Sequence, residues 1–468
     1  MSERRPLHFN AFVMNTTSHI HHGQWRRPDA GQTEFNDVNT WIDLAHLLEE
    51  AKFDAMFFAD VSGLYGDSDA DFDVYVREGL QIPSNDPAVL LGALAVSTTN
   101  IGLALTSNVI QNHPFNFARQ VSTLDHISNG RIAWNVVTGM QDNGARNFGL
   151  SQLTDHAERY RWADEYVDVT YKLWEGSWED DALLKDRERG YYSDPTKVHK
   201  IHHVGERYSV EGPHLPSPSP QRTPVLYQAG SSASGRRFAA RHAEAVFIIA
   251  PSPAIAREQI EETRRFAVEN GRRPEDLKFF QGLSFVIGDT EAEAQAKAEE
   301  YERYVSIDGY LAHAAIVDKT GRVYDPSTPL KDVDTNTAKG FLEWTAKFIT
   351  DREPTVGDLA YIQSRSTRIV GTPEQIADRI EEWQDAGVDG VNVINWVIPG
   401  SFAEFADKVL PVLRGRGLAQ SDYAPGPLRQ KLFGDARIND RHPAAQYRGA
   451  FAQRDGASEE ELDLAETP

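Results

Sequence analysis

Eight short apolar runs, each followed by a longer segment, constrain the fold of this chain more than any other feature. Most of these runs are rich in β-branched and aromatic residues, which is typical of strands buried on both faces. The expected strands are residues 7–14, 53–59, 101–106, 132–137, 224–228, 245–250, 277–287 and 390–397. Such strand–helix repeats predict an α/β fold, a TIM (β/α)8 barrel with insertions, whose site lies at the carboxyl ends of the strands.

The fourth expected helix carries the first candidate site. It begins near Asp155, and Asp155 and Glu158 have the spacing of a capping box. His156 and Tyr160 are four residues apart, so they share one face of the first turns, beside a helix N-terminus that favours anions. A strand, a polar loop and a helix start with an imidazole and a phenol form a cofactor site in many barrel enzymes. The alternative is an ordinary helix with a surface histidine.

Length and charge narrow the class of protein. A chain of 468 residues fits one large barrel with insertions or two to three smaller domains. Its net charge of −22 argues against a nucleic-acid partner and against an anionic membrane surface. We see no apolar run long enough for a membrane span and no signal-peptide pattern. The absence of cysteine excludes disulfides, thiolate catalysis and cysteine-ligated metals, so we expect a soluble, cytoplasmic enzyme.

Residues 1–425 are expected to form a single barrel domain that two insertions interrupt. Residues 176–222 are polar, and they end in GPHLPSPSPQRTP, which is typical of a loop. Residues 305–370 carry mixed helical signals and are a candidate lid over the barrel mouth. Residues 426–468 form a C-terminal extension whose acidic end, ASEEELDLAETP, is expected to be disordered.

Polar residues at three strand ends are candidates for ligand binding. Asp60 closes the second strand and Thr106 closes the third, so both should lie at the barrel mouth. Asp60 could instead accept hydrogen bonds from loop N–H groups in a purely structural role. Ser231 and Ser232 follow the fifth strand in a run of small residues that opens a helix. This run suits a phosphate, although such runs are often only helix caps.

Histidines after the first strand invite a metal interpretation. Metal-dependent barrel hydrolases of the amidohydrolase type carry such a histidine cluster there, and they also need Lys on the fourth strand and His on the fifth and sixth. The expected strands here lack those Lys and His residues, so we expect no metal site. His19 and His22 remain candidates for a pocket wall or for acid–base work.

Longer motifs point to a known family. The sequence resembles the bacterial-luciferase-like flavin monooxygenases, in the branch of the nitrilotriacetate and dibenzothiophene-sulfone monooxygenases, with the long-chain alkane monooxygenases most similar. The resemblance extends over nearly the whole chain. Its motifs include NAFVMN (10–15), HIHHGQWR (19–26), KFDAMFFAD (52–60), QIPSNDP (81–87), STLDHISNGRIAWNVVTG (122–139), DHAERYRWADEY (155–166), GPHLPSPSPQRTPVLYQAGSSASGRRFAARHAEAVF (212–247) and VIPGSFAEFADKVLPVLRGRG (397–417).

This resemblance implies a two-component monooxygenase on a luciferase-like TIM barrel. A separate NAD(P)H:flavin reductase would supply FMNH2, and O2 would add at the flavin C4a to give a (hydro)peroxide that oxygenates a small-molecule substrate. The protein would orient the reactants and exclude water, with residues 305–370 as the lid. Family members with this barrel are usually homodimers.

The resemblance also assigns site residues. By family position the flavin is held by Asp60 and Thr106 at the isoalloxazine, by His156 and Tyr160 on the ribityl-phosphate side, and by Ser231 and Ser232 at the phosphate. His19 and the lid residue His313 are the catalytic candidates, as neutral imidazoles that could hold or protonate an oxygen of the peroxide.

The substrate is the least constrained part of the prediction. A chelator anion would need several basic residues at the mouth, and the loops offer only Arg26, Arg27 and Arg146. Met140 stands in the loop where alkane-oxidising members carry histidine, which departs from the alkane pattern. We therefore expect an apolar or organosulfur substrate. Two alternatives are a deazaflavin-dependent dehydrogenase and a non-catalytic flavin-binding protein on the same barrel.

Overall fold

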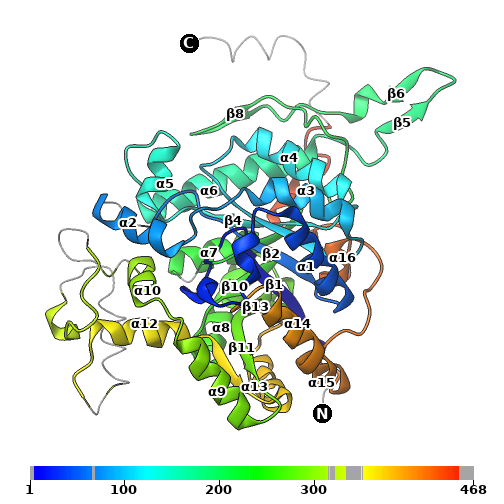
Figure 1. Cartoon of the computed structure of the whole chain (residues 1–468). Helices are drawn as coiled ribbons and strands as arrows, with labels where there is room; N and C mark the ends of the chain where they lie inside the picture. Colours follow the sequence, from blue (N-terminus) through cyan, green and yellow to red (C-terminus); the bar gives the residue numbers. More distant parts are fainter. Residues whose placement is uncertain are drawn as a thin grey trace.

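The computed structural model contains a closed barrel of eight parallel strands. It describes residues 5–65, 69–230, 232–314, 316, 322–333, 349 and 352–452. Around the barrel the strands follow the order β10, β9, β4, β3, β2, β1, β13 and β11, and a β10–β11 pairing closes the ring. Their bounds are β1 His8–Met14, β2 Ala55–Ala59, β3 Gly102–Asn108, β4 Ile132–Val137, β9 Val225–Gln228, β10 Ala245–Ile248, β11 Lys278–Ile287 and β13 Gly390–Ile394. The predicted TIM barrel is therefore confirmed (Figure 1).

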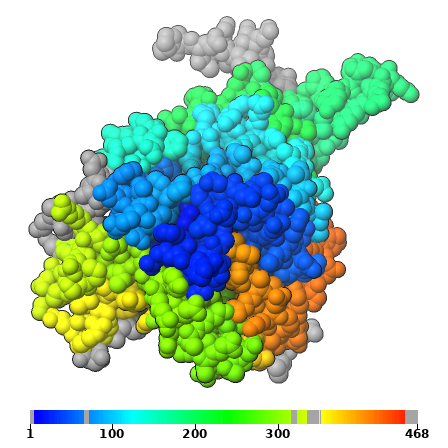
Figure 2. All heavy atoms as spheres, viewed as in Figure 1, coloured from blue at the N-terminus to red at the C-terminus, as the bar shows by residue number. Residues whose placement is uncertain are grey.

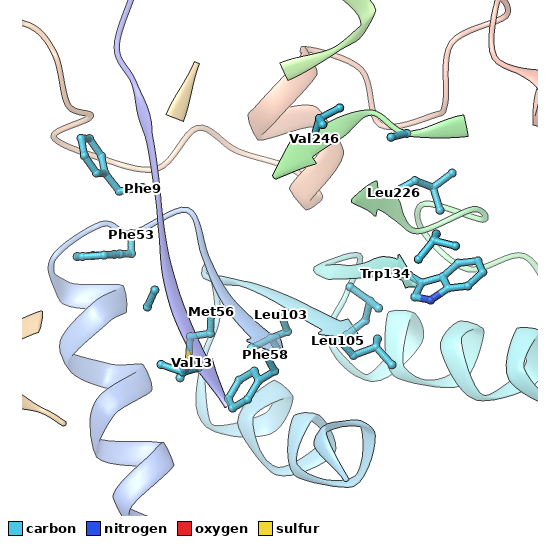
Figure 3. Close-up of a cluster of buried hydrophobic side chains, with 14 of the residues drawn as sticks. Phe9, Val13, Phe53, Met56, Phe58, Leu103, Leu105, Trp134, Leu226 and Val246 are labelled. Carbon is cyan, nitrogen blue, oxygen red and sulfur yellow. The ribbon is translucent and has the colours of Figure 1, made fainter. Parts of the chain in front are cut away.

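Successive side chains along each strand point alternately out of the barrel and into it, and so form two layers of core. The outward set packs between the strands and the surrounding helices, and it includes Phe9, Met56, Leu103, Trp134 and Val246 (Figure 3). This layer explains why the runs are apolar at most positions rather than at every second one, because a barrel strand is buried on both faces.

The inward set fills the barrel interior. Phe12, Phe57, Tyr227 and Phe280 meet there, with ring centroids of neighbouring pairs 5.2–5.6 Å apart. Helix α16 (Leu428–Phe433) adds Leu428 and Leu432 to the same apolar cluster. The C-terminal segment thus contributes to the barrel core, while the acidic end of the extension lies outside the described residues.

Helices cover the outside of the barrel. Seven of the expected helices are present as α1 Val38–Glu50, α3 Pro87–Ser97, α4 Pro114–Ile127, α6 His156–Tyr171, α7 Ala233–His242, α8 Pro253–Glu269 and α9 Glu291–Glu302. The expected helix after β13 is divided into α14 Gly400–Glu404, a π-turn and α15 Leu410–Gly415. Helices not anticipated are α2 Asp69–Glu78, α5 Asp142–Asn147, α13 Pro373–Asp385 and the α16 helix described above. No helix in the described part of the chain is long and apolar enough to cross a membrane.

The first insertion contains more structure than a loop. Two hairpins interrupt it, formed by β5 (Leu183–Asp186) with β6 (Tyr191–Ser193) and by β7 (His203–Val204) with β8 (Ser209–Val210). The sequence did not indicate these short strands because their side chains are mostly polar. The first hairpin projects into solvent and buries little apolar surface (Figure 2). The GPHLPSPSPQRTP stretch that follows is free of helix and strand, as predicted.

The second insertion is described only in part. Helices α10 (Ile307–His313) and α12 (Val356–Arg365) pack on each other, and α10 also contacts α2. The lid is expected to extend to residue 370, but its last residues belong to a strand instead. This strand, β12 (Arg368–Gly371), pairs in parallel with β11 and adds a ninth strand to the sheet. Four residues carry little periodicity, so only the partner strand reveals this element.

Candidate functional site

A cavity of about 390 Å³ opens at the carboxyl ends of β2, β3, β4 and β9. This position agrees with the rule that parallel barrels place their sites at this face. The cavity is lined by Asp60, Val61, Ser62, Tyr65, Thr106, Asn108, Gln111, residues 136–141, His156, Arg159, Tyr160, residues 228–230 and Ser232.

Five of the predicted flavin-binding residues line this one cavity. They are Asp60, Thr106, His156, Tyr160 and Ser232, which come from four separate parts of the chain. Ser231 lies outside the described residues.

The N-terminus of α7 forms one corner of the cavity. Ser232 is its N-cap, and its hydroxyl accepts a hydrogen bond from the Gly235 N–H at 3.0 Å. The same hydroxyl lies 3.2 Å from Nε2 of His156. The rings of His156 and Tyr160 are 5.2 Å apart, so the spacing of four residues does place them on one face. This corner combines a helix N-terminus, an imidazole and a hydroxyl, which suits an anion.

Two glycines make the corner possible. A Cβ on Gly235 would lie 2.8 Å from the Gly230 Cα and 2.8 Å from the Tyr160 hydroxyl. A Cβ on Gly230 would lie 2.4 Å from Nε2 of Gln228. A Cβ on Gly230 would also lie 2.8 Å from the Gly235 Cα, so the close approach of these two backbone segments requires glycine at both positions.

The predicted capping box at the start of α6 is wrong. Asp155 is the N-cap, yet its carboxylate makes no capping hydrogen bond. Glu158 instead pairs with Arg161 and Arg207. The guanidinium of Arg207, which the second hairpin brings close, competes for the carboxylate, and the sequence spacing could not reveal that contact.

Two buried amide atoms in the cavity lining have no hydrogen-bond partner among the described residues. They are Oε1 of Gln228 and Nε2 of Gln141. Thr106 is buried, and its hydroxyl accepts a hydrogen bond from Asn135 at 2.9 Å. Buried polar atoms are nearly always paired, so these amides indicate a ligand with its own donors and acceptors.

Asp60 follows β2 directly and occupies the cavity wall. Burial raises the pKa of its carboxyl to about 7, and the nearby Asp86 contributes to this increase. Hydrogen bonds from the Val61 N–H and the Gln111 side chain act in the opposite direction. Asp60 can therefore change its protonation state near neutral pH.

The two histidines predicted as catalytic do not line the main cavity. His313 lies behind Tyr65, with ring centroids 4.4 Å apart, and His22 lies on its other side at 4.9 Å. His19 packs against Phe12 with ring centroids 4.5 Å apart. Burial lowers the pKa of His19 to about 3 and that of His313 to about 4, so both imidazoles are neutral near pH 7.

Sequence reasoning missed several residues of the cavity, among them Arg159, Gln228 and Gln141. Arg159 follows His156 by one helical turn, and that spacing could have identified it. Gln228 is the last residue of β9, where a strand-end amide is as strong a signal as Asp60 or Thr106. Gln141 lies in an irregular loop, and its sequence context gives no signal.

Comparison with known proteins gives a consistent result. The profile of the luciferase-like monooxygenase family matches residues 14–390. The long-chain alkane monooxygenase of Geobacillus thermodenitrificans (strain NG80-2) is 43% identical over 447 residues, covering 95% of this chain and 98% of that protein. The dimethyl-sulfide monooxygenase of Hyphomicrobium sulfonivorans is 39% identical over 470 residues, covering 97% and 96%.

Solved structures agree with these matches. The crystal structure of DmoA from Hyphomicrobium sulfonivorans superposes with a TM-score of 0.89 at 40% identity, covering 97% of this chain and 99% of that one. A riboflavin lyase crystallised with modified FMN and riboflavin superposes with a TM-score of 0.85 at 37% identity, covering 95% and 100%.

The cavity residues fit a flavin mononucleotide. The α7 N-terminus, Ser232 and Arg159 suit a phosphate dianion. The unpaired amides of Gln228 and Gln141 suit the donors and acceptors of a flavin ring. The chain belongs to the luciferase-like monooxygenase family, as a flavin-dependent monooxygenase that uses reduced FMN and dioxygen.

Proposed function

We propose that this enzyme oxygenates a small apolar or organosulfur molecule with FMNH2 that a separate NAD(P)H:flavin reductase delivers. The observation that carries this proposal is the charge of the cavity. Among its described lining residues, Arg159 is the one guanidinium or ammonium group. If Arg159 serves the flavin phosphate, no cation is left for an aminopolycarboxylate. The two relatives reported above act, by their names, on a long-chain alkane and on dimethyl sulfide.

The flavin phosphate is proposed to lie at the α7 corner. Ser232 and the free N–H groups at the start of α7 would donate to its oxygens, with His156, Arg159 and Tyr160 around it. Ser231, which precedes the N-cap, is included as a further hydroxyl. This pose places the phosphate at the helix N-terminus, where the backbone carries partial positive charge.

The isoalloxazine is proposed to lie between β2 and β4. Asp60 and Thr106 would contact it, as would the amides of Gln141 and Gln228. When bound in reduced form, the flavin supplies the two electrons that activate dioxygen. The protein positions the ring and excludes water from it, and the second insertion, through α10, is proposed to cover the mouth.

His19 and His313 are proposed to act as neutral hydrogen-bonding groups rather than as cationic acids. Nδ1 of each imidazole is buried and has no partner among the described residues. With folded-state pKa values of about 3 and 4, neither is cationic near pH 7. Tyr65, which separates His313 from the cavity, would have to turn for His313 to reach a bound oxygen.

We also propose a cytoplasmic homodimer that associates through α3. This helix, PAVLLGALAVS, carries no charged residue, and Val89 and Val96 are 75% and 76% exposed. Exposed apolar helix faces of this kind are typical of subunit interfaces. A cytoplasmic location would give the enzyme access to reductase and NAD(P)H.

Two measurements test this function. The first is FMN binding, followed by quenching of flavin fluorescence. The second is incorporation of labelled oxygen from 18O2 into dimethyl sulfide, a long-chain alkane or nitrilotriacetate, with FMNH2 from an added reductase. We expect label in one of the first two. Label only in nitrilotriacetate would contradict the substrate class. Oxidation of an alcohol with a deazaflavin and without O2, or FMN binding without any turnover, would favour one of the two alternatives.

A further inference from the structure

A second cavity of about 240 Å³ lies beside the flavin cavity, on the outer side of β3. Leu105 and Ser107 of β3, Ala88 of α3 and Gln120 of α4 line it. Leu105 belongs to the outward layer of the barrel (Figure 3), so this cavity lies between the strands and the helices and not in the barrel interior.

Three residues line both cavities, namely Asp60, Thr106 and Gln111. They are therefore the wall between the two spaces. Asp60 is the only one of the three that can release or take up a proton near neutral pH. A carboxyl group in such a wall can exchange protons with either side.

The hydrogen bonds of Gln111 fix the orientation of its side-chain amide. Its Oε1 accepts from the Asn108 N–H at 2.7 Å and lies 3.3 Å from the Ser107 hydroxyl. The amide NH2 is therefore the group that donates to the Asp60 carboxyl, together with the Val61 N–H. These two donors stabilise the carboxylate, burial stabilises the acid, and the balance leaves both forms accessible.

The second cavity borders the protein surface at residues that do not line the first cavity. Asp86 and Phe148, which also line it, are exposed at the surface. Its volume is large enough for several water molecules, and Ser107, Gln120 and Asp86 provide polar partners for them. Water can therefore approach Asp60 from outside the barrel even when ligands fill the flavin cavity.

The charged and titratable groups around Asp60 are few. Asp86 faces it from the start of α3. His156, Arg159 and Tyr160 of α6 and Tyr65 of the β2 loop line the flavin cavity on its other side. Of these, Asp86 is the one whose charge affects the ionisation of Asp60, and it favours the protonated form.

We propose that Asp60 is a proton-transfer residue, which takes protons from water in the second cavity and passes them to the flavin cavity. The proposal rests on the proposed function, because it places the flavin in the first cavity. With the reduced flavin as its monoanion, the reaction RH + O2 + FMNH− + H+ → ROH + FMN + H2O consumes one proton from solvent. The O–H bond of Asp60 breaks as the bond to the acceptor forms, and water of the second cavity then reprotonates the carboxylate.

The test measures the carboxyl group itself in the complex with oxidised FMN, where no turnover occurs. Fluorescence quenching first shows that FMN binds. Infrared difference spectra, with Asp60→Asn to identify the band, then give the midpoint of the Asp60 acid and its rate of hydrogen–deuterium exchange. Ala88→Leu narrows the second cavity, and Ala296→Leu, at an exposed position of α9 that lines neither cavity, is the matched control.

We expect a midpoint near 7, lowered in Asp86→Asn, which keeps an N-cap residue on α3. Exchange should be at least about tenfold slower in Ala88→Leu than in Ala296→Leu, with equal affinity for FMN. If Ala88→Leu does not fold, Gln120→Trp fills the same cavity from α4. Unchanged exchange in the filled cavity, or no titrating Asp60 band, overturns the proposal. Failure of FMN to bind would overturn the proposed function instead.

Discussion

The hydroxyl of Ser232 lies 3.2 Å from Nε2 of His156 and joins the N-termini of α7 and α6. The two residues are 76 positions apart in the sequence. Both helices follow barrel strands, so the closure of the sheet is what brings their first turns together. This contact defines the corner in which we place the flavin phosphate.

Replacement of this hydroxyl should weaken FMN binding. Ser232→Ala removes a donor to the phosphate, worth about 1.5–3 kcal/mol for a charged partner, so we expect a Kd about 10–100-fold higher. It also removes the N-cap of α7, at a cost of about 1 kcal/mol. Thr290→Ala, at the N-cap of α9 and away from the cavity, controls for the cap alone. Equal FMN affinity in both variants, measured by fluorescence quenching, would exclude this phosphate position.

Gly235→Ala should abolish FMN binding. Its Cβ would lie 2.8 Å from the Tyr160 hydroxyl and from the Gly230 backbone, so the corner must widen. The matched control is Gly415→Ala in α15, where a Cβ meets nothing within 4 Å. We expect that control to be as stable as the parent or up to about 1 kcal/mol more stable. Calorimetric titration with FMN distinguishes the two variants.

Asp60 should make stability depend on pH. Its folded-state pKa of about 7 is raised above the ordinary value of 3.8, so between these limits the native state binds more protons than the unfolded state. The contribution of Asp60 to the free energy of unfolding therefore decreases by about 1.4 kcal/mol per pH unit as pH rises from 4 to 7. Asp60→Asn should lack this decrease. Urea titrations of both proteins at pH 5 and 8 measure the difference, and parallel pH profiles would refute the raised pKa.

Arg429 should be essential for the stability of the fold at the amino ends of β9 and β10. Its buried guanidinium donates to both carboxylate oxygens of Glu244, at 2.7 and 2.9 Å, and to the Pro224 carbonyl. Arg429→Ala leaves the buried carboxylate unpaired, which should cost about 3–5 kcal/mol of stability. The exposed pair Arg379–Glu382 provides the control, because Arg379→Ala should cost less than about 1 kcal/mol. Chemical denaturation that gives equal losses would contradict this assignment.

Charge on α3 should separate the proposed dimer. Val89→Asp and Val96→Asp would place carboxylates in the middle of the apolar face, whereas Val268→Asp alters a similarly exposed valine on α8. Sedimentation velocity should show a monomer for the first two variants and a dimer for the third. A parent protein that sediments as a monomer would refute the interface.

The sequence by itself determined the barrel and most of its helices. Strands buried on both faces are apolar at most positions, and helices such as α3 and α4 begin with an N-cap residue followed by Pro, so local signals indicate their bounds. Family motifs also identified five residues that line one cavity, from Asp60 to Ser232. These features depend on local sequence periodicity or on contiguous family motifs.

Only the tertiary structure decided the rest. The strand β12 exists because the carboxyl end of β11, at residues 284–287, extends past its pairing with β10 and pairs with a further strand there. The capping box at Asp155 is absent because Glu158 pairs with Arg207 instead. The pKa of Asp60 depends on burial between two cavities, which no spacing reveals. Each of these depends on groups far apart in the chain, and their energies are set by the distances and the solvent exclusion that folding creates.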